Sequence, residues 1–376
     1  PFPFDSDKYL MVHEANLGQF SIDPTRVYYS VIDITLDGGL GAVIQKNDTI
    51  LEDTLSWGLA ACKHANGRDW WVVAVHDGNP LIYKMLFTPD GLNSITTQQL
   101  NYSFNTWGNA SQILFSQKGD KFLYNSGINQ TQSGYLLLAD FDRCTGTFYN
   151  EQVVPVSTAA YLWGLAFSPS GEFVYTCTST EIFQINTQSF NVDTVAIYDG
   201  FCYPNPPWCT TFLLMYLAAN GKIYITSGSG VQHIHEMNYP DSAGTACDVQ
   251  QHSINLGIWN FRSVPNHPNY YLGPVANSVC DSLGLGITNH EQGIRNFQVS
   301  PNPNNGSFQI MYLLPQNKSG VFEVYDIDGR KVYTQHLPPW STLQQITLPG
   351  LTDGIYQCVI TSDGKRAVKK VVVLKE

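Results

Sequence analysis

Few residues of this chain could do chemistry, and none forms a familiar catalytic motif. His233 and His235 are two residues apart, so in a strand they would share one face and could hold a metal ion with a third ligand. Asp140 and Asp142 have the same spacing and could form the carboxylate pair that glycoside chemistry requires. We expect the histidines to line either a solvated face or a central channel, and the aspartates to anchor a turn before Arg143. We therefore predict no catalytic residue, no metal and no cofactor.

Recognition by stacking is a second kind of chemistry that the sequence allows. The sequence contains no G-x-S-x-G elbow, H-E-x-x-H pair, P-loop or G-x-G-x-x-G fingerprint. Its tryptophans, if exposed, could stack against sugars; if buried, they would pack between sheets. The candidates are Trp70, Trp71, Trp107, Trp163 and Trp208.

The cysteines are candidates for disulfides rather than for a metal or redox centre. Seven of the eight precede residue 281, and no C-x-x-C pair occurs. Cys202 and Cys209 bracket a Pro-rich loop whose ends could meet, so we expect them to pair in an oxidising compartment. Cys247 and Cys280 form a second candidate pair.

The elements that would position these residues are strands in a repeat. Glycines follow one another at spacings of 52, 52 and 50 residues, at Gly67, Gly119, Gly171 and Gly221. Each lies in a turn between an apolar run and an aromatic-rich run, where a left-handed backbone is expected. A period of about 50 residues with about four strands is typical of a β-propeller blade.

The repeat predicts an all-β domain, a β-propeller, over residues 1–283. Tyr9–Asp53 adds a further unit, giving about five blades, and Tyr270–Val275 adds extra strand material. A five-blade ring and a larger ring that has lost N-terminal blades both fit, since the chain opens on Pro1 without a Met. A β-sandwich is the competing architecture, but an even spacing of this length is not expected of it.

Charge distinguishes a second region near the C-terminus. From Glu291 onward there are nine Lys/Arg and seven Asp/Glu, which leaves eleven against 24 in the rest of the chain. The acidic part has no basic stripe, so nucleic acid is not an expected partner. No apolar run approaches the length of a membrane span. We expect a linker at 284–293 and a small immunoglobulin-like β-sandwich of six or seven short strands at 294–376.

The long part resembles a family of Bacteroidetes propeller proteins. The matching phrases cover nearly all of residues 25–283 and include Tyr29–Asp33, His64–Trp71, Asp140–Gly146, Phe167–Gly171, Asn220–Ile225 and Pro265–Pro274. The resemblance implies a propeller and carries no established activity.

The last eighty residues resemble the type A C-terminal sorting domain of the type IX secretion system. The motif residues occur in order and close the chain: Pro301, Asn302, Pro303, Gly306, Phe308, Tyr325, Asp326, Gly329, Gly354, Tyr356, Gly364, Lys365, Lys369 and Lys370.

This second resemblance implies a route and a set of partners. Such domains guide a folded passenger through an outer-membrane translocon and are recognised by a β-barrel shuttle protein. A sortase-like cysteine peptidase then removes the domain and links some passengers to anionic lipopolysaccharide. The expected location is the cell surface or the medium, outside the outer membrane. Five Asp-Ser/Thr tripeptides also resemble Bacteroidetes O-glycosylation sites, at Thr49, Thr54, Thr194, Ser242 and Ser282.

These features lead to one expected role and two alternatives. We expect a secreted or surface-held cargo whose propeller is a non-catalytic binding or adhesion module for an unknown carbohydrate or protein. The alternatives are a surface hydrolase or lyase acting on polysaccharide or peptide, and a structural part of the secretion or gliding apparatus.

Overall fold

A computed structural model describes most of the chain as strands. It covers residues 1–3, 5, 7–16, 24–102, 112–125, 133–157, 161–204, 207–276, 278–280, 294–314, 318–339 and 342–375. Two compact units are present, one of Pro1–Ala218 with Lys222–Leu283 and one of Ala219–Gly221 with Gly284–Glu376. In the described residues the only helices are single 3-10 turns at Asp37–Gly39 and Gly244–Cys247. No helix in these ranges is long and apolar enough to cross a membrane. The linker expected at 284–293 lies outside them.

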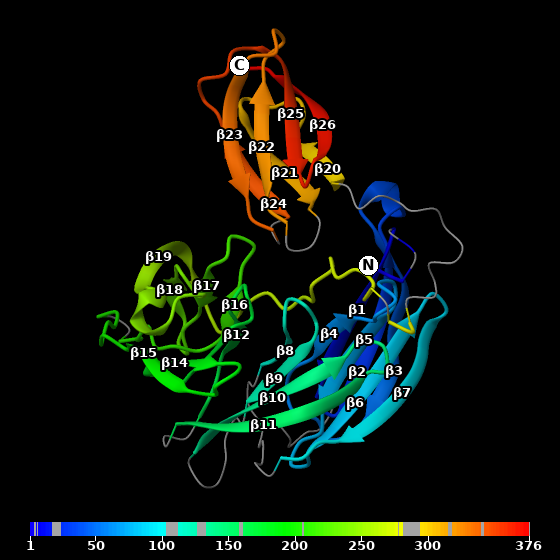
Figure 1. The fold of residues 1–376 in the computed structure, drawn as a ribbon, viewed down its shortest axis with the longest axis vertical. Coiled ribbons are helices and arrows are strands. Elements are labelled where there is room, and N and C mark those ends of the chain that lie inside the picture. The colour runs from blue at the N-terminus through cyan, green and yellow to red at the C-terminus, as the bar shows by residue number, and fades with distance from the viewer. Residues whose placement is uncertain are drawn as a thin grey trace. The chain divides into compact units, whose positions relative to one another are not determined.

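The first unit consists of five antiparallel sheets, each built from strands that follow one another in the chain (Figure 1). The first sheet contains β1 (Lys8–Ala15), β2 (Arg26–Asp33) and β3 (Ala42–Glu52). The second contains β4 (Ala60–Lys63), β5 (Trp70–Val75), β6 (Leu81–Thr88) and β7 (Gly91–Gln99). The third contains β8 (Ile113–Phe115), β9 (Lys121–Asn125), β10 (Gly134–Asp142) and β11 (Thr147–Ser157). The fourth contains β12 (Leu165–Phe167), β13 (Phe173–Cys177), β14 (Glu181–Asn186) and β15 (Val192–Ile197). The fifth contains β16 (Met215–Leu217), β17 (Ile223–Ile225), β18 (Val231–Met237) and β19 (Val249–Asn260). Small sequential antiparallel sheets of this kind are consistent with propeller blades, as the repeat predicted.

The turn glycines have the conformation that the repeat required. Gly67, Gly119, Gly171 and Gly221 have φ values of 71°, 70°, 78° and 84°, where a side chain would be strained. Each turn joins the first two strands of a sheet, which pair antiparallel. The spacing of about 50 residues between these glycines therefore reflects one tight turn in each of the second to fifth sheets.

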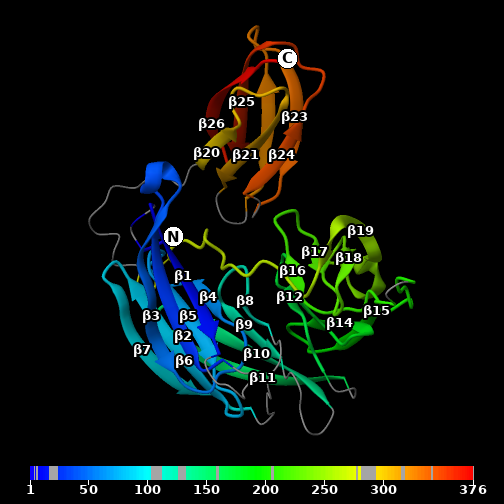
Figure 2. The ribbon, with the colours of Figure 1, turned by 180° about the vertical axis from the view of Figure 1, so that it is seen from behind.

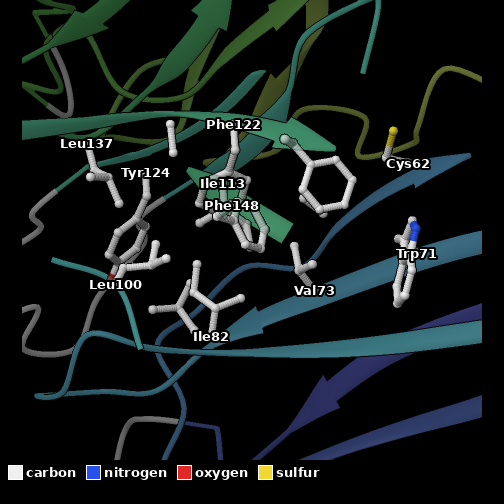
Figure 3. Packing of buried hydrophobic residues seen from close by; sticks show 14 of the residues in the cluster. Cys62, Trp71, Val73, Ile82, Leu100, Ile113, Phe122, Tyr124, Leu137 and Phe148 are labelled. Carbon is white, nitrogen blue, oxygen red and sulfur yellow. The ribbon is translucent and has the colours of Figure 1, made fainter. Parts of the chain in front are cut away.

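Hydrophobic cores lie between successive sheets of the first unit. Because neighbouring residues of a strand face opposite ways, β5 contributes to two cores. Val72 packs with Val27 of the first sheet, whereas Val73 packs with Phe122 of the third (Figure 3). The same alternation produces one core between the third and fourth sheets and another between the fourth and fifth.

A return segment, residues 265–276, brings the chain from the fifth sheet back to the second and third (Figure 1). The Asn269 side chain donates to the Gln117 carbonyl at 2.7 Å, and the Val275 amide donates to the Ala65 carbonyl at 2.8 Å. Leu272 is buried in the core between those sheets. The expectation of strand material at Tyr270–Val275 was wrong, because this segment binds loops and turns rather than a sheet edge.

The second unit packs two antiparallel sheets around one core (Figure 2). One sheet has the order β20 (Arg295–Ser300), β21 (Ser307–Leu313) and β24 (Leu343–Thr347). The other has the order β23 (Lys331–Leu337), β22 (Gly320–Tyr325), β25 (Gly354–Ser362) and β26 (Lys365–Val373). These seven strands match the expected sandwich in number and place; an immunoglobulin-like strand arrangement stays a prediction.

Candidate functional site

Exposed aromatic rings gather beside the Cys202–Cys209 loop of the first unit. Trp208, Trp259 and Phe261 are 45%, 52% and 63% exposed. The two indole rings lie with centroids 5.8 Å apart and planes at 79°. Tyr203 contacts Trp259 at a centroid distance of 5.8 Å, and Phe201 stacks on His252 at 4.3 Å. We call Phe201, Tyr203, Trp208, Trp259 and Phe261 the aromatic platform.

Three histidines lie beneath this platform, and each has a partner. The Tyr203 hydroxyl is hydrogen-bonded to Nδ1 of His233, and Nε2 of His252 lies 2.9 Å from a carboxylate oxygen of Asp199. The His252 amide donates to Nδ1 of His235 at 3.0 Å. Burial lowers the pKa of His235 to about 4, so this imidazole is neutral at physiological pH. Within the described ranges no cluster of three His, Cys, Asp or Glu could hold a metal.

Two disulfides are present in the first unit. Cys202 is bonded to Cys209, which closes the loop that carries Tyr203 and Trp208. Cys280 is bonded to Cys144, so the expected Cys247–Cys280 pair was wrong. Cys247 is instead a buried thiol in the core between the fourth and fifth sheets. Cys280 lies four residues after the return segment and is bonded to Cys144 in the turn after β10.

The remaining candidates of the first unit have structural roles. Asp142 anchors a turn by accepting from the Cys144 amide at 2.8 Å and the Thr145 hydroxyl at 2.9 Å. Asp140 forms an ion pair with Lys121. Of the two aspartates expected to anchor a turn, Asp142 does so, whereas Asp140 contacts a neighbouring strand. The absence of a catalytic role for the pair stays a prediction.

The five tryptophan candidates differ in exposure. Trp70 and Trp71 are buried between sheets, and Trp163 is half-buried. Trp208 is the member of this set on the aromatic platform, and Trp107 lies outside the described residues.

The glycosylation candidates also differ in exposure. Thr49, Thr54 and Thr194 are exposed and Ser242 is half-buried, whereas Ser282 lies outside the described ranges. Their modification stays a prediction.

In the second unit, the turn-rich segment before β21 lies along the outer edge of β26. The Asn302 side chain donates to the Lys370 carbonyl at 3.0 Å and accepts from the Val372 amide at 2.8 Å. Asn304 continues this pairing, because its amide donates to the Val372 carbonyl and its carbonyl accepts from the Leu374 amide. Pro301 and Pro303 flank Asn302. The segment therefore covers the last third of an edge strand that would otherwise present unpaired backbone groups.

Gly306 and Phe308 serve the fold of this unit. Gly306 has a φ of 97°, and an added Cβ would lie 2.8 Å from the Leu348 carbonyl oxygen. Phe308 is completely buried in the core. The Tyr356 hydroxyl donates to the Thr352 carbonyl at 2.9 Å, which closes the loop before β25.

Two tight turns account for a further group of motif residues. Asp326 accepts from the Arg330 amide at 2.8 Å, and Gly329 has a φ of 79° in the same turn. Gly364 has a φ of 73° in the two-residue hairpin between β25 and β26. Tyr325, on the strand before the first turn, donates to the Glu323 carboxylate at 2.9 Å.

A groove of about 620 Å³ opens on this unit between the turn after β22 and the loop before β25. Its lining includes Asp326, Gly354 and Tyr356 together with the apolar side chains of Ile327 and Ile355. Ile327 is 81% exposed and Ile355 is 43% exposed. Exposed apolar side chains around a groove are typical of a surface that binds a partner.

Residues 298–374 match the family described as the secretion system C-terminal sorting domain. The C-terminal unit is a type IX sorting domain. It marks this protein as an exported cargo that interacts with the secretion machinery and is secreted or held at the cell surface.

Comparisons over the rest of the chain are weaker. A search of curated proteins found no match. Two similar solved structures are candidate 6-phosphogluconolactonases from Bacteroides species. The B. uniformis protein is 11% identical over 98% of this chain and 97% of its own, with a TM-score of 0.42. The B. fragilis protein is 13% identical over 99% of both chains, with a TM-score of 0.41. These similarities are too low to bear on the activity of this protein.

The sorting domain has a basic edge strand. Lys369 and Lys370 are exposed on β26 with Arg366, while Lys365 is half-buried next to the hairpin. In this part of the chain, the motif glycines and buried aromatics serve folding. Lys369, Lys370, Pro301 and Pro303 are exposed at the surface.

Sequence reasoning missed several members of the aromatic platform and one disulfide cysteine. Trp259 and Phe261 lie about fifty residues after Trp208, and Cys144 lies 136 residues before Cys280. No local pattern links such positions. The repeat of about fifty residues was the one signal that could have related Trp208, in the loop after β15, to Trp259 at the end of β19.

Proposed function

We propose that this protein is a type IX cargo whose first unit is a non-catalytic binding or adhesion module displayed outside the outer membrane. The sorting domain directs the folded passenger through the outer-membrane translocon and is recognised by a β-barrel shuttle protein. A sortase-like cysteine peptidase then cuts within or near the expected linker at 284–293. Its product is released or is linked to anionic lipopolysaccharide.

The groove of the sorting domain supports recognition by a folded partner. Ile327 and Ile355 are exposed beside it, although an apolar side chain gains nothing from contact with water. The motif residue Gly354 lies in the same lining. We therefore propose that the shuttle protein buries these two isoleucines, with the exposed lysines of β26 contributing at the rim.

The observation that carries the binding role is the aromatic platform. Exposed tryptophans are typical of recognition surfaces. The solvent-accessible polar groups around it are paired with one another, Asp199 with His252 and Tyr203 with His233. The described serine hydroxyl near a histidine, that of Ser227 at 3.5 Å from Nε2 of His235, is buried with it and out of reach of a substrate. This pattern favours recognition over hydrolysis.

Export is tested by expressing tail variants in the native host. Deletion of residues 298–374 is expected to trap the passenger in the periplasm, whereas the parent chain reaches the surface or medium without its tail. A charge placed on the groove by Ile327→Glu with Ile355→Glu is expected to leave the tail uncut. Met311→Glu is the matched control, because Met311 is exposed on the other sheet of the sandwich.

Four outcomes would contradict this proposal. Surface delivery of the deletion variant would show that another signal directs export. Normal processing of the doubly substituted chain would exclude the groove as the recognition surface. Turnover of a polysaccharide or peptide by the purified chain would favour the hydrolase or lyase alternative, and stable co-purification with the translocon after cleavage would favour a structural part of the apparatus.

A further inference from the structure

The aromatic platform is held in place by covalent and backbone contacts. The Cys202–Cys209 disulfide closes the loop, and the Tyr203 amide donates to the Trp208 carbonyl at 2.8 Å. The Trp208 ring lies directly over Gly230, where an added Cβ would lie 3.0 Å from it. The platform is therefore ordered before a ligand arrives, which lowers the entropy cost of binding.

The opposite wall of the platform comes from the end of β19 and the residues after it. Trp259 faces Trp208 at nearly a right angle. Arg262 donates to the Gly228 carbonyl at 3.1 Å, and its guanidinium lies 5.0 Å from the centre of the Phe261 ring. The one cation described at this wall is thus engaged with the backbone and with a ring.

The polar groups among the rings are hydroxyl, imidazole and carboxylate. Tyr203 with His233 and Asp199 with His252 provide both donors and acceptors at the surface. Gln251 adds an amide next to them and donates to the Ile197 carbonyl. Flat apolar faces interleaved with such groups match a sugar, which presents C–H faces and hydroxyl edges.

The geometry points to the aromatic platform as a binding site for a neutral carbohydrate. The exposed faces of Trp208 and Trp259, which meet at nearly a right angle, stack against the sugar. The Tyr203–His233 and Asp199–His252 pairs bind the hydroxyls of the ligand. This inference rests on the proposal that the passenger is a binding module, and it names the ligand class.

The charge of the site selects a neutral ligand over the other classes. An anionic polysaccharide or a nucleic acid needs free cations, whereas Arg262 is engaged and Asp199 adds a negative charge. The passenger region before Glu291 also has eleven Lys/Arg against 24 Asp/Glu, which disfavours polyanions over the whole surface.

The test uses the purified full-length chain in affinity electrophoresis and calorimetry. The probes are four neutral polysaccharides (laminarin, dextran, yeast mannan and arabinoxylan) and the polyanion alginate. At least one neutral probe is expected to bind, and Trp208→Ala and Trp259→Ala are each expected to weaken that binding about tenfold, the effect of losing one stacked ring. Tyr149→Ala is the matched control, because Tyr149 is an exposed ring on β11 outside the platform.

A second variant tests the contribution of the Cys202–Cys209 disulfide apart from that of the aromatic rings. Replacing both Cys202 and Cys209 with serine keeps every ring but releases the loop, so it is expected to weaken binding several-fold while the circular dichroism spectrum is unchanged. Equal affinity in this variant would exclude the disulfide as the device that orders the site.

The results distinguish failure of this inference from failure of the binding role. Binding of none of the neutral probes, binding of alginate alone, or neutral binding that both alanine variants retain would overturn the carbohydrate site. If cells that lack the protein lose adhesion to a surface, and cells with Trp208→Ala regain it fully, the passenger is a binding module that works through another surface.

Discussion

Replacing Arg143 with methionine is expected to destabilise the first unit strongly. The guanidinium is almost completely buried and donates to the Lys63 and Gly273 carbonyls at 2.7 Å and to the His64 carbonyl at 3.3 Å. The Arg143 side chain therefore connects the turn between β4 and β5 to the return segment. Burial lowers the pKa of Arg143, but the side chain stays charged.

The size of the effect follows from these contacts. A hydrogen bond from a charged donor contributes about 1.5–3 kcal/mol, so loss of the two short ones costs about 3 kcal/mol or more. Methionine keeps most of the stem's packing, so the loss reports the hydrogen bonds rather than a cavity. With a urea slope of about 3 kcal/mol per molar, the unfolding midpoint should fall by about 1 M.

Tryptophan fluorescence in urea measures the unfolding midpoint of the first unit. Seven of the eight tryptophans precede residue 284, so they report on that unit. Arg26→Met is the matched control, since Arg26 forms an exposed ion pair with Glu52 and its loss should leave the midpoint unchanged. A urea midpoint for Arg143→Met within about 0.2 M of the parent's would refute the role given to these carbonyl contacts.

Three further outcomes are expected. Gly306→Ala should unfold the sorting domain and abolish surface delivery, seen by cell fractionation, because its Cβ would lie 2.8 Å from the Leu348 carbonyl oxygen; normal delivery would contradict this. Burial raises the pKa of Glu14 to about 7, so the folded state holds a proton that the unfolded state loses above about pH 4.5, and stability falls as pH rises from there to about 7. Glu14→Gln should therefore raise the thermal midpoint at pH 8 but not at pH 4, and an equal effect at both would argue against the ionisation. Replacing Cys144 and Cys280 with serine should cost about 4 kcal/mol in urea unfolding, because the bond closes a loop of 136 residues; an unchanged midpoint would show that the return segment is held by its other contacts.

Much of the fold could be predicted because its signals are local. A glycine at a left-handed turn and alternating apolar residues beside it act over about ten residues, so Gly119 and its strands were readable without a structure. The same holds for the Asp-Gly turns and ordered motifs of the sorting domain. Tyr270–Val275 misled for the same reason: its apolar residues look like a strand, but the segment forms no strand, and Leu272 is its one buried side chain.

The sequence by itself determined the strands, their turns, the two-part organisation and the secretion signal. Only the tertiary structure decided that Cys280 bonds Cys144, and that the Trp208 ring contacts the Trp259 ring. Local conformational preference specifies a turn, but the partner of a distant residue depends on how whole sheets pack and where the return segment passes. The aromatic platform is made by that packing.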